Sequence, residues 1–141
     1  MSAVVVDAST SLAWCFPDEK SDHADRVLVS LKGKHILVPA VWGLEIANAI
    51  LVGERKRRLS QPEIRRFIMF LESLSLVQDV RQPREYLNEV LPLAHAHGLS
   101  AYDACYLELS IRNAAPLATL DSKLQSAAKR AGVHLFTGEQ V

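Results

Sequence analysis

Short apolar runs alternate along the chain with longer stretches in which apolar residues recur at intervals of three and four. The short runs are typical of buried β-strands, and the longer stretches are typical of helices that bury one face. The predicted strands are residues 3–7, 35–38, 76–80, 117–119 and 133–136. The predicted helices are residues 9–16, 22–32, 41–57, 63–74, 83–97, 101–113 and 122–131.

This alternation favours one particular architecture. Parallel strands need a long connection such as a helix, whereas antiparallel strands are commonly joined by two-residue turns, which we do not find between the predicted strands. We therefore predict a three-layer α/β/α sandwich around a short, mainly parallel sheet of four to five strands. A chain of 141 residues has the size of one domain, so residues 1–141 are predicted to form a single domain.

Local signals mark where several helices begin and bend. Ser60 and Glu63 have the spacing of a capping box, and Ser100 is a predicted N-cap for the helix that follows it. Pro92 falls inside the helix predicted over residues 83–97. Because proline removes a backbone donor and crowds the preceding turn, we expect it to kink that helix.

The composition describes a globular chain without net charge. Hydrophobic residues make up 49% of the chain, and 16 Lys and Arg balance 16 Asp and Glu. A neutral chain has no overall field to attract a polyanion, so any contact with nucleic acid has to be local. Cys15 and Cys105 match no metal-finger spacing, which excludes a disulfide framework. No apolar run is long enough for a bilayer and no signal peptide is evident, so we expect a cytoplasmic protein without membrane contact.

Four acidic residues fall at predicted strand ends or helix starts. Asp7 ends the first strand and Asp121 follows the fourth, whereas Glu45 and Asp103 lie in the first turns of two helices. Taken alone, each has an ordinary explanation, because acids cap helix N-termini and complement the helix dipole. Asp7 fits that explanation least well, since an acid directly after three valines is poor strand material.

A parallel sheet would gather these four carboxylates at one edge, where ligands of such folds bind. At a separation of about 5 Å, two carboxylates repel by about 3 kcal/mol at an effective dielectric constant of about 20. Such a cluster has to retain protons or bind cations. Oxygen ligands without nearby His or Cys favour Mg²⁺ or Mn²⁺ over Zn²⁺, so we predict a site for one or two of these ions. Ions held in this way typically serve phosphoryl chemistry.

The sequence around the four acids resembles a known family. The blocks VVVDAS, VPAVWGLEIANAI, GLSAYDACYLELS and PLATLDSKL, in this order, are similar to the PIN domain and specifically to VapC-type toxins of bacterial toxin–antitoxin pairs. The resemblance covers nearly the whole chain and implies a single PIN-like domain. Members of the family are metal-dependent ribonucleases that usually leave a 5′-phosphate and a 3′-hydroxyl. The resemblance therefore implies a Mg²⁺- or Mn²⁺-dependent endoribonuclease that serves as the toxin of a type II toxin–antitoxin system.

The resemblance also assigns roles to individual residues. Ser9 and Thr119 match hydroxyl positions beside the acids, and Asn48 lies one turn after Glu45, where a residue that orients a metal ligand would lie. No further acid follows soon after the last of the four, where some PIN domains have one. This difference from the family bears on whether a second ion binds. The residues that match the family's acidic positions, as catalytic residues and metal ligands, are Asp7, Glu45, Asp103 and Asp121.

Basic residues gather at the turn between the helices predicted over residues 41–57 and 63–74. They either form a solvated turn or contact RNA phosphates or an acidic segment of a partner. The candidates for such contacts are Arg55, Arg57 and Arg58.

The second helix of this pair carries apolar residues on several faces. Phe67 and Phe70 are predicted to face a partner, because apolar surface beyond what one core face needs usually marks an interface. In the family this helical pair helps to grip the antitoxin, and homodimers are common. The resemblance thus implies a cognate antitoxin, an RNA substrate and a homodimer.

Two alternatives from other functional classes remain open. A receiver-type phosphoacceptor domain has about this length and an acid after its first strand, but the acidic pair and the late lysine that it needs are not evident. A catalytically silent PIN-like binding module would keep the fold without cleavage, although four retained acids argue against it. A dinucleotide-binding fold is disfavoured, because the residues that follow Asp7 form no glycine-rich loop.

Overall fold

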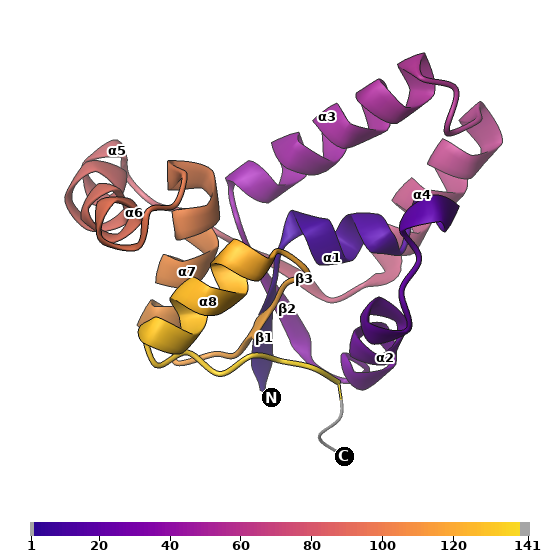
Figure 1. Ribbon diagram of the computed structural model, residues 1–141. Helices are drawn as coiled ribbons and strands as arrows, with labels where there is room; N and C mark the ends of the chain where they lie inside the picture. Colours follow the sequence, from indigo (N-terminus) through magenta and orange to yellow (C-terminus); the bar gives the residue numbers. More distant parts are fainter. Residues whose placement is uncertain (1, 139–141) are drawn as a thin grey trace.

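Four short parallel strands form the centre of the protein. The structure, a computed structural model, describes residues 2–138. The strand order is β3-β2-β1-β4, and all neighbours run parallel. Figure 1 shows the sheet at the centre, with β1, β2 and β3 labelled. The strands are β1 (Ala3–Val6), β2 (His35–Pro39), β3 (Leu76–Asp79) and β4 (Leu117–Ala118).

Helices connect the strands and cover both faces of the sheet, which confirms the predicted three-layer α/β/α architecture. Because side chains alternate along a strand, Val5 packs on one face with Leu107 and Leu124, whereas Val4 packs on the other face with Val27. The helices are α1 (Ala8–Ala13), α2 (Asp22–Ser30), α3 (Val41–Arg55), α4 (Gln61–Ser73), α5 (Pro83–Glu85), α6 (Leu91–His97), α7 (Ala101–Asn113) and α8 (Ser122–Arg130), with a short 3₁₀ turn η1 (Pro17–Glu19).

The sheet has four strands, and the fifth predicted strand, residues 133–136, is reduced to one bridge. Leu117 and Leu135 form this isolated parallel bridge, in which the Leu117 N–H donates to the His134 carbonyl oxygen at 2.9 Å. The chain after α8 thus pairs with β4, the edge strand, at this one position.

The segment over residues 83–97 is helical, and a wider helical turn lies just before Pro92, where the sequence predicts a kink. A π-helical segment η2 (Tyr86–Val90) separates α5 from α6, and the Leu91 N–H donates to the Tyr86 carbonyl oxygen. The wider π-turn lies directly before Pro92, where a regular helix would bring the proline ring against the carbonyl of Asn88.

The predicted capping signals are in place. Ser60 accepts a hydrogen bond from the Glu63 N–H, and the Glu63 side chain accepts one from the Ser60 N–H, which forms a reciprocal capping box at the start of α4. Ser100 accepts from the Asp103 N–H at 3.1 Å and caps α7. These bonds fix where both helices begin.

α3 and α4 form a long hairpin that projects from the sheet (Figure 1). At its base, Phe67 packs with Ala8, Ile46 and Leu71 in a buried cluster. Phe67 is only 6% exposed, so the expectation that it faces a partner is wrong. Apolar residues occur on several faces of α4, and the helix turns Met69, which is 65% exposed, outward instead.

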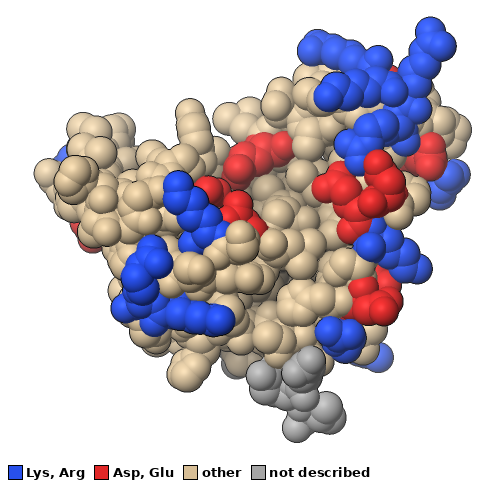
Figure 2. All heavy atoms as spheres, in the orientation of Figure 1, with Lys and Arg blue, Asp and Glu red and all other residues tan. Residues whose placement is uncertain are grey.

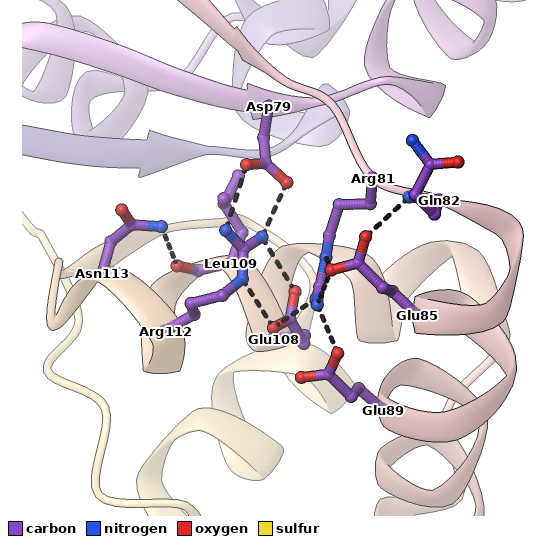
Figure 3. A network of polar contacts seen from close by, with 9 residues as sticks. All are labelled: Asp79, Arg81, Gln82, Glu85, Glu89, Glu108, Leu109, Arg112 and Asn113. Atoms are coloured by element: carbon purple, nitrogen blue, oxygen red, sulfur yellow. Dashed lines mark hydrogen bonds and ion pairs between the residues drawn. The ribbon is translucent and has the colours of Figure 1, made fainter.

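An ion-pair network holds α7 against the end of the sheet (Figure 3). Arg81 lies in the loop between β3 and α5, and its side chain is 6% exposed. It reaches acids of α5, η2 and α7, while Arg112 of α7 reaches back to the end of β3. The network comprises Asp79, Arg81, Glu85, Glu89, Glu108 and Arg112.

No helix within residues 2–138 is both long and apolar enough to cross a lipid bilayer.

Candidate active site

Asp7 lies at the carboxyl end of β1, directly before α1. Its side chain caps α1 by accepting from the Thr10 N–H at 3.0 Å. The Ser9 hydroxyl donates to both carboxylate oxygens at 2.8 and 2.9 Å, and the Thr119 hydroxyl donates to Oδ2 at 2.5 Å. Asp7 is 4% exposed. The carboxylate is therefore buried and held in one orientation.

The same two hydroxyls join the start of α1 to the loop after β4. Ser9 Oγ accepts from the Leu120 N–H, and Thr119 Oγ1 accepts from the Asp121 N–H, each at 3.0 Å. Each hydroxyl thus donates to Asp7 and accepts from the loop that carries Asp121. The predicted placement of Ser9 and Thr119 beside the acids agrees with these bonds.

Glu45 lies in the first turns of α3, and one of its oxygens is occupied. The Tyr106 hydroxyl of α7 donates to Glu45 Oε1 at 2.5 Å. Asn48, which the sequence places one turn after Glu45, is exposed, and its side chain has no hydrogen bond to Glu45 within residues 2–138. The structure therefore does not place Asn48 as the residue that orients Glu45, because Tyr106 approaches from the protein interior while Asn48 faces solvent.

Asp103 and Asp121 lie at the starts of α7 and α8. Asp121 Oδ1 accepts from the Leu124 N–H at 3.0 Å and caps α8. Asp103 lies in the first turn of α7, and its backbone N–H donates to the Ser100 hydroxyl oxygen. Both acids are partly exposed. They therefore face solvent at the same end of the sheet where Asp7 is buried.

Electrostatic interactions link the four acids in series. Burial raises the pKa of Asp7, against the lowering effect of the hydrogen bonds from Thr119, Thr10 and Ser9. Burial also raises the pKa of Glu45, and the charges of Asp103 and Asp7 raise it further, whereas the Tyr106 bond lowers it. The pKa of Asp103 is raised by burial and by the charge of Asp121. The raised pKa values mean that burial and mutual repulsion make the ionised forms of these acids less favourable in the folded protein.

Figure 2 shows acidic side chains in the hollow between the α3–α4 hairpin and the part of the molecule formed by α7 and α8. The fold thus gathers the predicted acids at one edge of the sheet. Within residues 2–138, however, no three His, Cys, Asp or Glu side chains are placed to hold one metal ion together. The four acids form an acidic hollow, not a closed cage of four ligands.

The basic residues gather at the far tip of the hairpin (Figure 2). Arg55 and Arg57 are exposed there, and Arg57 has a left-handed backbone with φ of 58°. Arg58 is engaged within the protein: it pairs with Asp18 at 2.7 Å and with Glu19 at 2.9 Å. Its guanidinium also lies over the Phe16 ring. All three predicted contacts are exposed, and Arg58 differs from Arg55 and Arg57 in being bound to these acids.

Phe70 is half-buried and meets Trp14 edge to face, with ring centroids 6.1 Å apart. It lines two adjoining hollows beside α1, one of them shared with Phe16 and Leu28. Phe70 is therefore more open to solvent than Phe67, which lines one of the same two hollows from a buried position.

Comparisons with known proteins identify the fold and the family. The PIN domain family model matches residues 4–130. Ribonuclease VapC3 from Pyrobaculum aerophilum is 31% identical over 121 residues, which cover 86% of this chain and 91% of that protein. The crystal structure of PAE2754 from the same organism superposes with a TM-score of 0.66 at 26% identity, covering 89% of this chain and 79% of that one.

Two more distant structures share the fold. VapBC2 from Rickettsia felis, bound to a DNA fragment from its promoter, has a TM-score of 0.63 at 17% identity, with coverage of 95% and 97%. FitAcB from Neisseria gonorrhoeae has a TM-score of 0.59 at 15% identity, with coverage of 98% and 99%. The family match argues against the receiver-type alternative. A match over residues 4–130, together with a relative that is 31% identical across most of both chains, shows that this chain belongs to the PIN domain family.

Proposed function

We propose that this chain is a metal-dependent endoribonuclease and the toxin of a type II toxin–antitoxin pair. The observation that carries the proposal is the series of interacting carboxylates at the carboxyl edge of the sheet, which the fold assembles from four separate elements. The family match and the relative named Ribonuclease VapC3 support the same activity.

The acidic hollow suits Mg²⁺ or Mn²⁺ by the chemistry of its donors. All four predicted ligands are carboxylates, and three of them have raised pKa values because burial and neighbouring charges disfavour their ionised forms. A divalent cation would relieve both effects. Mg²⁺ usually keeps several waters and binds through one or two carboxylates, so an open hollow without a three-ligand cage is compatible with it. We propose one or two ions held by Asp7, Glu45, Asp103 and Asp121.

The residues of this chain would prepare the site in distinct ways. A bound divalent ion supplies polarisation of the phosphodiester and lowers the pKa of water. Asp7 is fixed by the Ser9 and Thr119 hydroxyls, so it offers a preorganised negative charge at the bottom of the hollow. Asp103 and Asp121 lie at its partly exposed rim, where the RNA backbone would enter.

RNA needs a positive contact, because the acidic hollow itself repels phosphate. Arg55 and Arg57 at the hairpin tip are exposed and supply this charge locally, as a neutral chain requires. In the left-handed backbone conformation of Arg57, arginine is about 1 kcal/mol less favourable than glycine. An arginine at such a position supports a role for its guanidinium. We propose that these two arginines contact RNA phosphates.

We further propose two protein partners for this chain in the cytoplasm. An antitoxin would bind the hollow that Phe70 lines together with Phe16 and Leu28 beside α1 and α2. A second copy would cover the outer side of α3, where Leu44 is 74% exposed and Leu51, seven residues later on the same face, is 44% exposed. A Leu44→Glu variant tests the homodimer by light scattering, and an unchanged dimer mass would contradict this choice of surface.

Cleavage of RNA during a Mn²⁺ titration tests the activity. Asp7→Asn and Asp103→Asn should each abolish cleavage, whereas Asp22→Asn, an exposed acid in the first turn of α2, should leave it unchanged. Undiminished cleavage by either site variant would remove the acids from the mechanism. Wild-type protein that binds its antitoxin but cleaves no RNA with Mn²⁺ would favour the silent binding module.

A further inference from the structure

Tyr106 is buried where three acid-bearing elements meet. It is 1% exposed, and its hydroxyl donates to Glu45 Oε1 across 61 positions of the sequence. The bond to Glu45 fixes the direction of the phenol proton.

The position of Tyr106 relates it to two of the four acids. Glu45 is bonded to the hydroxyl itself. Asp103 lies three residues before Tyr106 on α7, so the two side chains share one face of that helix. The hydroxyl thus links α7, which carries Asp103, to Glu45 of α3.

We propose that Tyr106 is a positioning residue of the acidic site, an inference that rests on the proposed function. By holding Oε1, its hydroxyl fixes the rotamer of Glu45 and leaves Oε2 as the oxygen that a divalent ion can take. Partners that hydrogen-bond a ligating carboxylate orient it and strengthen the site. Tyr106 touches neither substrate nor ion and acts through Glu45.

A purely structural role makes a different prediction. A buried tyrosine needs a partner for its hydroxyl in any case, and loss of that bond would lower stability without changing ion affinity. The two roles are separated by measuring Mn²⁺ binding to the folded protein in the absence of RNA.

Isothermal titration calorimetry with Mn²⁺ alone is the test. Tyr106→Phe should bind Mn²⁺ about 10-fold to 100-fold more weakly than the wild type. Tyr86→Phe removes a hydroxyl from a ring that packs against the same core and should bind as the wild type does. Equal affinity of the wild type and Tyr106→Phe would overturn the inference. Wild-type protein that binds no Mn²⁺ would refute the proposed function itself.

A double variant tests whether Tyr106 acts through Glu45. If it does, Tyr106→Phe combined with Glu45→Gln should bind Mn²⁺ no more weakly than Glu45→Gln alone. A further loss, equal to that seen in the single variant, would show that Tyr106 acts by another route and would overturn the inference.

Nuclear magnetic resonance of the wild type keeps the inference testable if Tyr106→Phe fails to fold. With carbon-13 in the Cζ position of tyrosine, the Tyr106 resonance should shift as Mg²⁺ binds, because the ion withdraws charge from the carboxylate that accepts its proton. Tyr86→Phe and Tyr102→Phe variants assign the three signals. A Tyr106 signal that stays constant while Mg²⁺ saturates the site would refute the inference.

Discussion

Replacing Arg81 by methionine should destabilise the fold, because this residue joins the loop after β3 to α5, η2 and α7. Its guanidinium contacts Glu85 at 2.8 Å and Glu108 at 2.7 Å, and it also pairs with Glu89 (Figure 3). The pKa of Arg81 is raised, mainly by the hydrogen bond to Glu85, so the side chain is firmly charged. Methionine keeps much of the length and removes the charge.

The size of the stability loss depends on whether Glu85, Glu89 and Glu108 keep a partner or reach water once Arg81 is replaced. Breaking a fully buried ion pair costs about 3 to 5 kcal/mol, because a buried charge is left without a partner. Here Glu85 and Glu89 are 35% and 50% exposed, so water replaces Arg81 at both. Glu108 is 10% exposed, but Arg112 remains bonded to it at 2.9 Å. We therefore expect a loss of about 2 kcal/mol, or about 7 °C in Tm for a chain of this length.

Urea unfolding followed by circular dichroism measures this loss. The slope of the free energy against urea should stay constant, since the surface exposed on unfolding hardly changes. Arg84→Met, at an exposed arginine nearby, is the matched control and should change stability by less than about 0.5 kcal/mol. Equal stabilities of the two variants would refute the view that the network anchors α7.

Three further predictions concern the hairpin and the acidic hollow. Because burial raises the pKa of Asp7 in the folded protein, its ionised form weakens the fold above that pKa, so Asp7→Asn should raise the urea midpoint at neutral pH. The gain should vanish as the pH falls below the ordinary value of 3.8, where the acid is protonated in both states, and a gain independent of pH would contradict this reasoning. Phe67→Ala should cost about 3 to 5 kcal/mol in the same assay and the exposed Met69→Ala less than about 0.5 kcal/mol; similar losses would show that Phe67 is not core. Arg57→Gly should stabilise the protein by about 0.5 to 1 kcal/mol and lower the slope of log RNA affinity against log salt by about 0.7 to 1, and an unchanged slope would exclude a phosphate contact.

The order of strands and helices could be predicted because burial leaves a periodic record in the sequence. β1 and β2 coincide with apolar runs, β3 begins at the apolar pair Leu76 and Val77, and the Ser60 and Ser100 caps lie where serine precedes a helical pattern. The π-turn before Pro92 could not be predicted in the same way. A proline shows that a regular helix is disturbed, but tertiary packing decides whether the chain bends or inserts a wider turn.

The acidic positions were visible in the sequence, but Tyr106, which holds one of these acids, was not. Tyr106 lies in a strongly apolar stretch of α7 and has the pattern of an ordinary core residue. Its spacing of three from Asp103 was the only local sign that it shares a face with the site. Its partner Glu45 is 61 residues away, and only the fold brings the two together. Phe67 and Met69 could not be told apart either, because apolar residues occur on several faces of α4.

The folded chain itself offsets part of the repulsion that the sequence predicts for four neighbouring carboxylates. Asp7 and Asp121 each cap a helix, where unpaired N–H groups carry a partial positive charge. The hydroxyls of Ser9 and Thr119 add donors at Asp7, so a value of about 3 kcal/mol for each pair of bare charges overstates the cost. What the chain does not offset remains as the raised pKa values of Asp7, Glu45 and Asp103. This residual cost is the free energy that a divalent cation would recover, and binding should therefore strengthen as the pH rises and these acids lose their protons.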